Sequence, residues 1–150
     1  MSTYNALSVP SYKKLLDGVY GLKKTYGSDD RYWNSAVFLD ASYLRYPTHQ
    51  TVQMLPQKWS MEILQQAQYA DYLGVPLFDN KHIGYSDIEI QKLKRIFDWM
   101  ISADDKNAIN RQRYNFGKFF KEHDIRRGTN FKETFPEFAE FYDDCQRIKL

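Results

Sequence analysis

Cysteine is almost absent from this 150-residue sequence, which contains only Cys145. A single thiol excludes a disulfide framework and any multi-thiolate metal site within one chain. The three histidines, His49, His82 and His123, are far apart and lack the His-x3-His spacing that zinc ligands usually show. We therefore expect no metal site in this chain.

Long apolar runs and a strong net charge are also missing. No stretch reaches membrane-spanning length, and the first residues, MSTYNALSVP, lack the basic and apolar regions of a signal peptide. The formal net charge of +2 is too small to indicate nucleic-acid or membrane binding by itself. These features predict a cytoplasmic protein that makes no contact with a membrane.

Complete catalytic motifs are missing as well. The sequence has no G-x-S-x-G motif, no Walker-type loop and no dinucleotide-binding glycine pattern. Cys145 lies beside Asp143 and Asp144, whose negative charges disfavour a thiolate nucleophile. The catalytic residues, if there are any, stay unassigned.

Aromatic residues are abundant and make up 17% of the chain. They suit a compact core, and they also leave rings available for stacking or for an interface. The length and the ordinary apolar and charged fractions predict a single domain over residues 1–150.

Helical periodicity predicts about five helices. Ser86 and Glu89 form an S-x-x-E capping box before the third helix, and Gly128 fits the left-handed residue that ends the fourth. Thr134 and Glu137 repeat the capping-box spacing before the last helix, with a proline in its first turn. The expected helices lie within residues 8–27 (ending at Gly27), 55–74, 86–101, 104–128 and from 134 onward.

Two short runs are rich in strand-forming residues, namely SAVFLD at 35–40 and TVQML at 51–55. Two strands alone form a marginal sheet, so helices must cover them or strands from elsewhere must join them. The predicted fold class is α+β and predominantly helical, with about five helices and two short strands.

The segment DASYLRYPTHQ follows the first predicted strand and is dense in polar and aromatic groups. Loops at strand ends are where α/β proteins bind ligands, so this segment is a candidate ligand site. The alternative is a turn held by Pro47, with Tyr46 and Leu44 packed inward. The ligand-facing candidates are Asp40, Tyr43, Arg45, Tyr46 and His49.

Basic and aromatic residues alternate between Lys106 and Arg127. Such a pattern can bind single-stranded nucleic acid through phosphate contacts and base stacking. Phe116 and Phe120 are four residues apart, however, which is the spacing of a core stripe. We therefore favour a structural interpretation, in which the basic residues form the solvated face of a helix and the aromatic residues form its buried face.

The corner HDIRRGTN allows three interpretations of Arg126 and Arg127. They can stabilise the negative end of the preceding helix, pair with Asp124, Glu133 or Glu137, or hold an anion together with backbone amides of GTN. Helix caps and ion pairs are common, which favours a structural role. The structural or anion-binding candidates here are Arg126, Arg127, Asn130 and Glu137.

Two segments, YLRYPTHQTVQMLPQKW and HDIRRGTNFKETFPEF, resemble recurring segments of radical S-adenosylmethionine proteins with a short twitch-type C-terminal extension. They stand in the same order, and the resemblance covers roughly residues 35–142. It implies the C-terminal half of a partial parallel barrel, with residues 44–47 near its mouth. It also implies an architectural closing element that includes Arg126, Arg127, Asn130, Phe131, Pro136 and Glu137.

The chain departs from that family in its cofactor ligands. Radical S-adenosylmethionine enzymes hold a 4Fe–4S cluster with a C-x3-C-x2-C loop, whereas this chain has one cysteine. We therefore expect no cofactor bound by this chain alone. S-adenosylmethionine and the 4Fe–4S cluster enter only if a partner chain supplies the cluster loop.

Three functional hypotheses follow. The first is a C-terminal fragment or partner subunit of a radical S-adenosylmethionine enzyme. The second is a small, non-enzymatic, phage-encoded interaction module that binds another protein chain through a strand edge or an aromatic surface. The third, nucleic-acid binding through the basic segment, is the least favoured.

Overall fold

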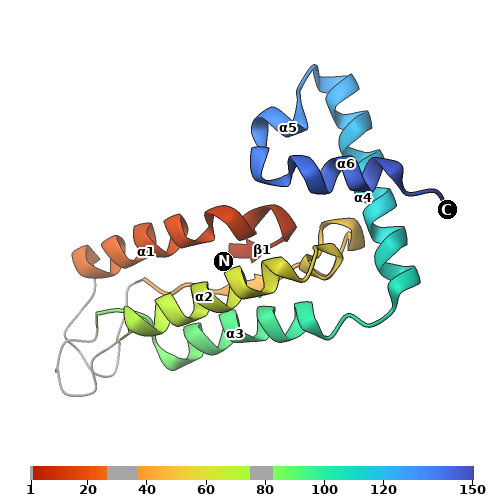
Figure 1. Ribbon diagram of the computed structural model, residues 1–150. Coiled ribbons are helices and arrows are strands. Elements are labelled where there is room, and N and C mark those ends of the chain that lie inside the picture. Colours follow the sequence, from red (N-terminus) through yellow and green to blue (C-terminus); the bar gives the residue numbers. More distant parts are fainter. Residues whose placement is uncertain (1, 27–36, 75–82) are drawn as a thin grey trace.

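The computed structural model describes residues 2–26, 37–74 and 83–150 (Figure 1). Within these ranges the chain is mostly helical and contains one two-stranded parallel sheet, which confirms the predicted fold class. None of the helices in the described ranges has both the length and the apolar character needed to cross a membrane.

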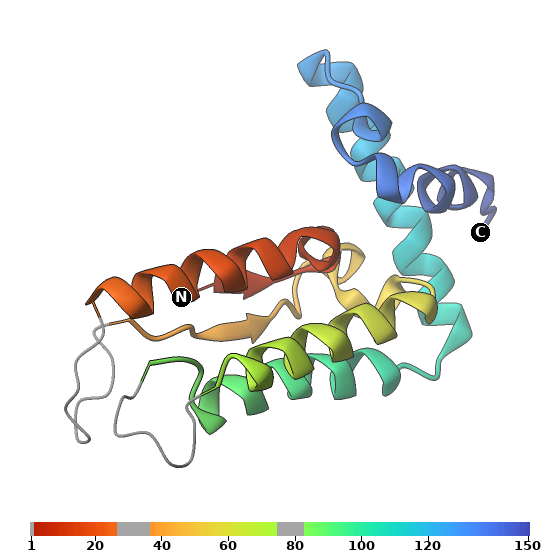
Figure 2. The same ribbon diagram turned by 60° about the vertical axis from the view of Figure 1, so that its left-hand side comes forward.

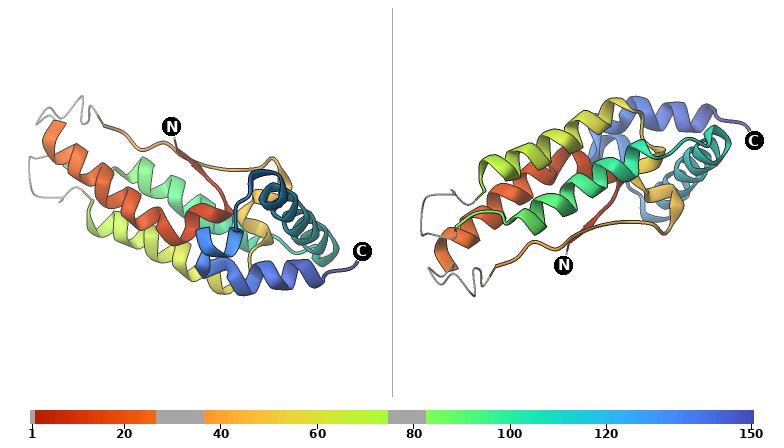
Figure 3. Two further views of the ribbon diagram at one scale, coloured as in Figure 1. Left: turned by 90° about the horizontal axis from the view of Figure 1, so that it is seen from above. Right: turned by 90° about the horizontal axis from the view of Figure 1, so that it is seen from below.

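The first half of the chain contains both strands, three α-helices and three 3-10 segments among its described residues. Its elements are β1 (Ser2–Tyr4), the 3-10 helix η1 (Ala6–Ser11), α1 (Tyr12–Tyr26), β2 (Ala41–Tyr43), the 3-10 turns η2 (Thr48–Gln50) and η3 (Val52–Met54), α2 (Lys58–Tyr72) and α3 (Asp87–Ile101). Helices α1, α2 and α3 run side by side (Figure 2), and the strands lie along one side of them with β2 at the outer margin (Figure 3).

The second half is entirely helical. It consists of α4 (Lys106–Arg127), α5 (Phe131–Thr134), the 3-10 turn η4 (Pro136–Phe138) and α6 (Ala139–Arg147). Helix α4 stands across the end of the first half, and α6 crosses it (Figure 1). Gly117 permits this close crossing, because a Cβ there would lie 3.2 Å from the Cβ of Cys145.

The predicted helix ends are confirmed at three positions. Ser86 and Glu89 form the capping box of α3, with both reciprocal bonds present. Asp105 caps α4 by accepting from the amides of Asn107 and Ala108, and Gly128 ends α4 at a φ of 63°. The predicted stop of α1 at Gly27 lies outside the described residues.

Both predicted strand positions were wrong. Residues 37–40 belong to no strand, and residues 35 and 36 lie outside the described ranges. The observed strand, β2, begins at Ala41, immediately after the predicted run ends at residue 40. It pairs with β1, a strand that was not predicted. Residues 52–54 form a 3-10 turn whose Val52 and Met54 are fully buried, so core packing accounts for that apolar run.

The predicted start of the last helix at Thr134 was also wrong. Asn130 caps the short helix α5, in which Thr134 is the last residue and donates its hydroxyl to the Asn130 carbonyl at 3.0 Å. Pro136 opens η4, and α6 begins only at Ala139. Thr134 and Glu137 have the spacing of a capping box, but Thr134 lies at the end of α5 and does not begin a helix.

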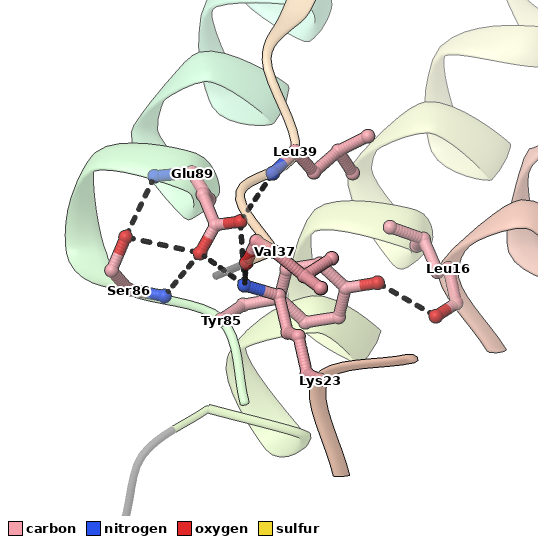
Figure 4. Close-up of polar contacts among 7 residues, drawn as sticks. All are labelled: Leu16, Lys23, Val37, Leu39, Tyr85, Ser86 and Glu89. Carbon is pink, nitrogen blue, oxygen red and sulfur yellow. Dashed lines mark hydrogen bonds and ion pairs between the residues drawn. The ribbon is translucent and has the colours of Figure 1, made fainter. Parts of the chain in front are cut away.

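A buried ion pair joins α1 to α3 and fixes the approach to β2 (Figure 4). Lys23 Nζ lies 2.8 Å from Glu89 Oε1, and both side chains are at most 2% exposed. The ammonium also donates to the Val37 carbonyl at 2.9 Å, and Glu89 Oε1 accepts from the Leu39 amide at 2.7 Å. Because these backbone groups come just before β2, the pair positions that strand.

Candidate functional site

The outer edge of β2 is the most distinctive polar feature of the candidate ligand segment. The strands pair in register as Ser2 with Ala41 and Tyr4 with Tyr43, and the Leu44 amide donates to the Tyr4 carbonyl at 2.8 Å. Alternate residues of a parallel strand point their backbone groups to opposite sides. The amide and carbonyl groups of Ala41 and Tyr43 therefore point away from β1. No hydrogen bond within the described ranges satisfies them.

A shallow hollow of about 270 Å³ lies along this edge. Its charged lining consists of Arg45, beyond the strand, and Lys92 and Arg95 from α3. Lys92 forms an ion pair with Asp40, whereas neither arginine has a carboxylate partner in the described part of the chain. The hollow is thus a positively charged surface next to unpaired backbone groups.

Tyr43 and Arg45, which line the hollow, belong to a stack of side chains. The Tyr43 ring stacks on Trp99 with 5.1 Å between ring centroids and an interplanar angle of 22°. Arg45 lies 5.2 Å and 5.5 Å from the centroids of these two rings and donates to the Tyr43 hydroxyl at 2.8 Å. Trp99 is held in turn by a bond from its indole nitrogen to Thr51 Oγ1.

The structure brings three of the five ligand-facing candidates together. Tyr43 and Arg45 line the hollow, and Asp40 is connected to it through its ion pair with Lys92. Tyr46 is 82% exposed and does not pack inward. His49 lies apart from them and packs against Phe119 of α4, with 5.0 Å between ring centroids. Burial lowers the pKa of His49 below its ordinary value.

Sequence reasoning missed Lys92, Arg95 and Trp99 at this site. All three lie on α3, about 50 residues after β2 in the sequence, since Lys92 is 52 positions from its partner Asp40. A signal was available for Trp99, because it is not part of the apolar stripe of the helix predicted at 86–101. That stripe consists of Ile90, Leu93, Ile96, Phe97, Met100 and Ile101. No pattern in the sequence pairs these positions with residues 40–45.

The corner after α4 is organised by Asp124 rather than by the arginines. Its carboxylate accepts from Thr129 Oγ1 and from the Phe131 amide, each at 2.8 Å. Its carbonyl accepts from the amides of Gly128 and Thr129, so these two amides of GTN already have partners. Asp124 thereby joins the end of α4 to the start of α5.

Of the three interpretations of the corner, the pairing of Arg126 or Arg127 with Asp124, Glu133 or Glu137 is not found in the described residues. Arg126 lies 3.6 Å from Glu122, one turn earlier, and Arg127 has no carboxylate partner in the described part of the chain. Asn130 caps α5 and donates to Glu133 at 2.9 Å, and Glu137 is exposed in η4. Asn130 is therefore structural, whereas the two arginines stay available on the surface.

Cys145 and the histidines offer little for catalysis. Burial raises the pKa of the Cys145 thiol to about 12, with a smaller contribution from Asp144. In the described ranges no group of three His, Cys, Asp or Glu side chains is placed to hold a metal ion, and His82 lies outside these ranges.

The chain matches no family model, no curated protein and no solved structure in the comparisons made. The resemblance to radical S-adenosylmethionine proteins therefore rests on the two sequence segments alone.

Proposed function

We propose that the chain is a protein-binding module that pairs the outer edge of β2 with an extended, acidic segment of a partner chain. The single observation that carries this proposal is the outer edge of β2, which has no backbone partner among the described residues and lies beside a hollow lined by Arg45, Lys92 and Arg95. An unpaired edge is a ready template for another strand, and a two-stranded sheet gains stability when a strand is added.

The acidic character of the partner follows from the positions of the cations. In strand addition, backbone hydrogen bonds give affinity and alternate side chains give specificity. Lys92 and Arg95 both come from α3, so they face one side of the added strand. We expect acidic side chains at every second position of that strand. Asp40 occupies only Lys92, which leaves two arginines for the partner.

The test is site-specific photo-crosslinking, with p-benzoylphenylalanine replacing Arg95. We expect crosslinks to one segment with alternating acidic residues, identified by mass spectrometry of the crosslinked peptide. The matched control places the same group at Glu140, an exposed position on α6. Equal crosslinking from both positions, or crosslinks to segments without acidic alternation, would rule out the proposed surface.

A pair of variants separates the backbone contribution from that of the ring. Tyr43→Ala removes the stack on Trp99 but keeps the outward-pointing amide, whereas Tyr43→Pro removes both. The proposal requires Tyr43→Pro to weaken crosslinking at position 95 more than Tyr43→Ala does. Thr3→Pro is the control, because its amide points to the opposite edge of the sheet.

A second candidate gives the partner a more specific identity, that of a chain with a three-cysteine cluster loop. It is favoured by the parallel pairing of β1 and β2, since parallel neighbours joined through a helix are the unit of parallel barrels. This chain would then contribute a strand and substrate-side residues, and the partner would hold the iron–sulfur cluster. Co-expression with a neighbouring cysteine-loop gene tests this: a co-purifying complex with iron absorbance supports it, and a lone monomer contradicts it.

A further inference from the structure

A second hollow, of about 730 Å³, lies between α4 and η2, away from the β2 edge. Its lining comes from successive turns of α4, together with His49 of η2. We propose that this groove binds a nucleotide, either free or as part of a single strand, by recognising its planar base and its phosphate. The proposal does not depend on the function proposed for β2.

Three neighbouring aromatic rings, those of His49, Phe119 and His123, line the groove. Phe119 is 42% exposed, although phenylalanine elsewhere on α4 is buried, as at Phe116 and Phe120. Its ring centroid lies 5.0 Å from that of His49 and 6.4 Å from that of His123. Phe119 contacts both imidazoles and still leaves part of its ring exposed in the groove, which suits stacking with a base.

The rim of the groove carries more positive than negative charge. Lys118, Arg126 and Arg127 line it, and Glu122 is its only acidic lining residue. Arg126 lies 3.6 Å from Glu122, but both side chains are more than 60% exposed, so this pair is weak. Lys118 and Arg127 have no carboxylate partner in the described part of the chain. Guanidinium groups are well suited to bidentate phosphate contacts.

The helix end explains only part of this arrangement. Arg126 and Arg127 lie in the last turn of α4, where a positive charge stabilises the helix terminus. That role needs neither the exposed ring of Phe119 nor Lys118, which lies two turns earlier. The helical spacing from 118 to 126 corresponds to roughly 12 Å along the axis. This distance lets a base lie on Phe119 while its phosphate reaches the arginines.

The test measures binding of adenosine monophosphate, of inorganic phosphate and of a ten-nucleotide single-stranded DNA at low salt. We expect the mononucleotide to bind at least tenfold more tightly than inorganic phosphate, because the ring is recognised as well as the charge. If the natural ligand is single-stranded, the oligonucleotide binds more tightly still and its affinity falls steeply with salt. Equal affinities for phosphate and nucleotide would overturn the proposal.

Variants locate the binding within the groove. The double variant R126Q/R127Q and the variant F119L should each weaken nucleotide binding by roughly tenfold. Glu122→Gln should strengthen it a few-fold, because the one negative charge of the rim is removed. Lys121→Gln is the matched control, since this exposed lysine lies on the same helix but does not line the groove. A control variant that weakens binding as much as R126Q/R127Q would assign the binding to net charge alone and overturn the proposal.

Discussion

The two halves of the molecule differ in the contacts that stabilise each of them internally. In the described residues from 2 to 103, several polar side chains are buried together with their partners, as in the Lys23–Glu89 ion pair and the Tyr4–Gln66 hydrogen bond. In residues 106–147, the core is a cluster of rings with few polar groups. The cluster comprises Phe116, Phe120, Phe131, Phe141 and Tyr142.

This difference follows from how each half is connected. The strands and helices of the first half meet across long stretches of sequence, and Lys23 and Glu89 are 66 residues apart. Directional polar contacts fix such a register, because a shifted arrangement would leave a buried charge without its partner. The second half is a local helical hairpin, for which apolar packing of neighbouring helices suffices.

The largest effect is expected from Lys23→Met, which leaves the Glu89 carboxylate buried without its cation. Removing one partner of a buried pair costs about 3–5 kcal/mol, and we expect a loss of that size in the free energy of unfolding. Urea denaturation measures it. Lys24→Met is the matched control, because the neighbouring lysine is exposed, and it should change stability by less than about 0.5 kcal/mol. Similar losses in both variants would contradict a structural role for the pair.

A smaller effect is expected from Phe116→Leu in the ring cluster. Phe116 is fully buried and contacts the rings of Phe120, Phe131 and Phe141 at centroid distances of 4.7–5.5 Å. Losing these ring pairs should cost roughly 2 kcal/mol. Native-state hydrogen exchange should show the loss of protection in α4 and α6 and not in α1 to α3. Protection lost equally in both halves would show that the ring cluster does not stabilise α4–α6 separately.

The helices could be predicted from the sequence because their signals are local. The apolar stripes of α2 and α3, the capping box at Ser86 and the glycine at 128 act within a few residues of one another. The error at Thr134 arose because a capping box and a helix end share the same residue types. Asn130, whose side chain accepts from the Lys132 amide, made the actual cap.

The strands could not be predicted because their pairing is not local. β1 has three residues, and its strand partner β2 lies almost 40 residues later, with Ser2 opposite Ala41. The same reason hid half of the candidate site, since α3 supplies Lys92, Arg95 and Trp99. Glu89 was recognised as a capping residue, but its ion pair with Lys23 depends on the packing of α1 against α3.

Loss of the α4 cap should have a modest effect that separates local from long-range stabilisation. Asp105 accepts from two backbone amides at 2.9 and 3.1 Å, so Asp105→Ala should cost about 1 kcal/mol. Asp104→Ala is the matched control, because it removes the adjacent exposed carboxylate without removing the cap. Chemical denaturation of both variants tests this, and equal losses would assign the effect to charge rather than to capping.

The smallest expected effect is a pH dependence that originates where the two halves meet, at His49. Burial against Phe119 lowers the folded-state pKa of His49, whereas the unfolded chain keeps a pKa near ~6.5. Between these two values the unfolded state binds more protons. His49 therefore reduces stability as the pH falls below about 6.5 and has no effect above about 7.5. Urea midpoints of the wild type and His49→Gln should differ more at pH 5.5 than at pH 8. His123 stays in both proteins, so its titration cancels, and a pH-independent difference would show that protonation of His49 does not weaken the junction between α4 and η2.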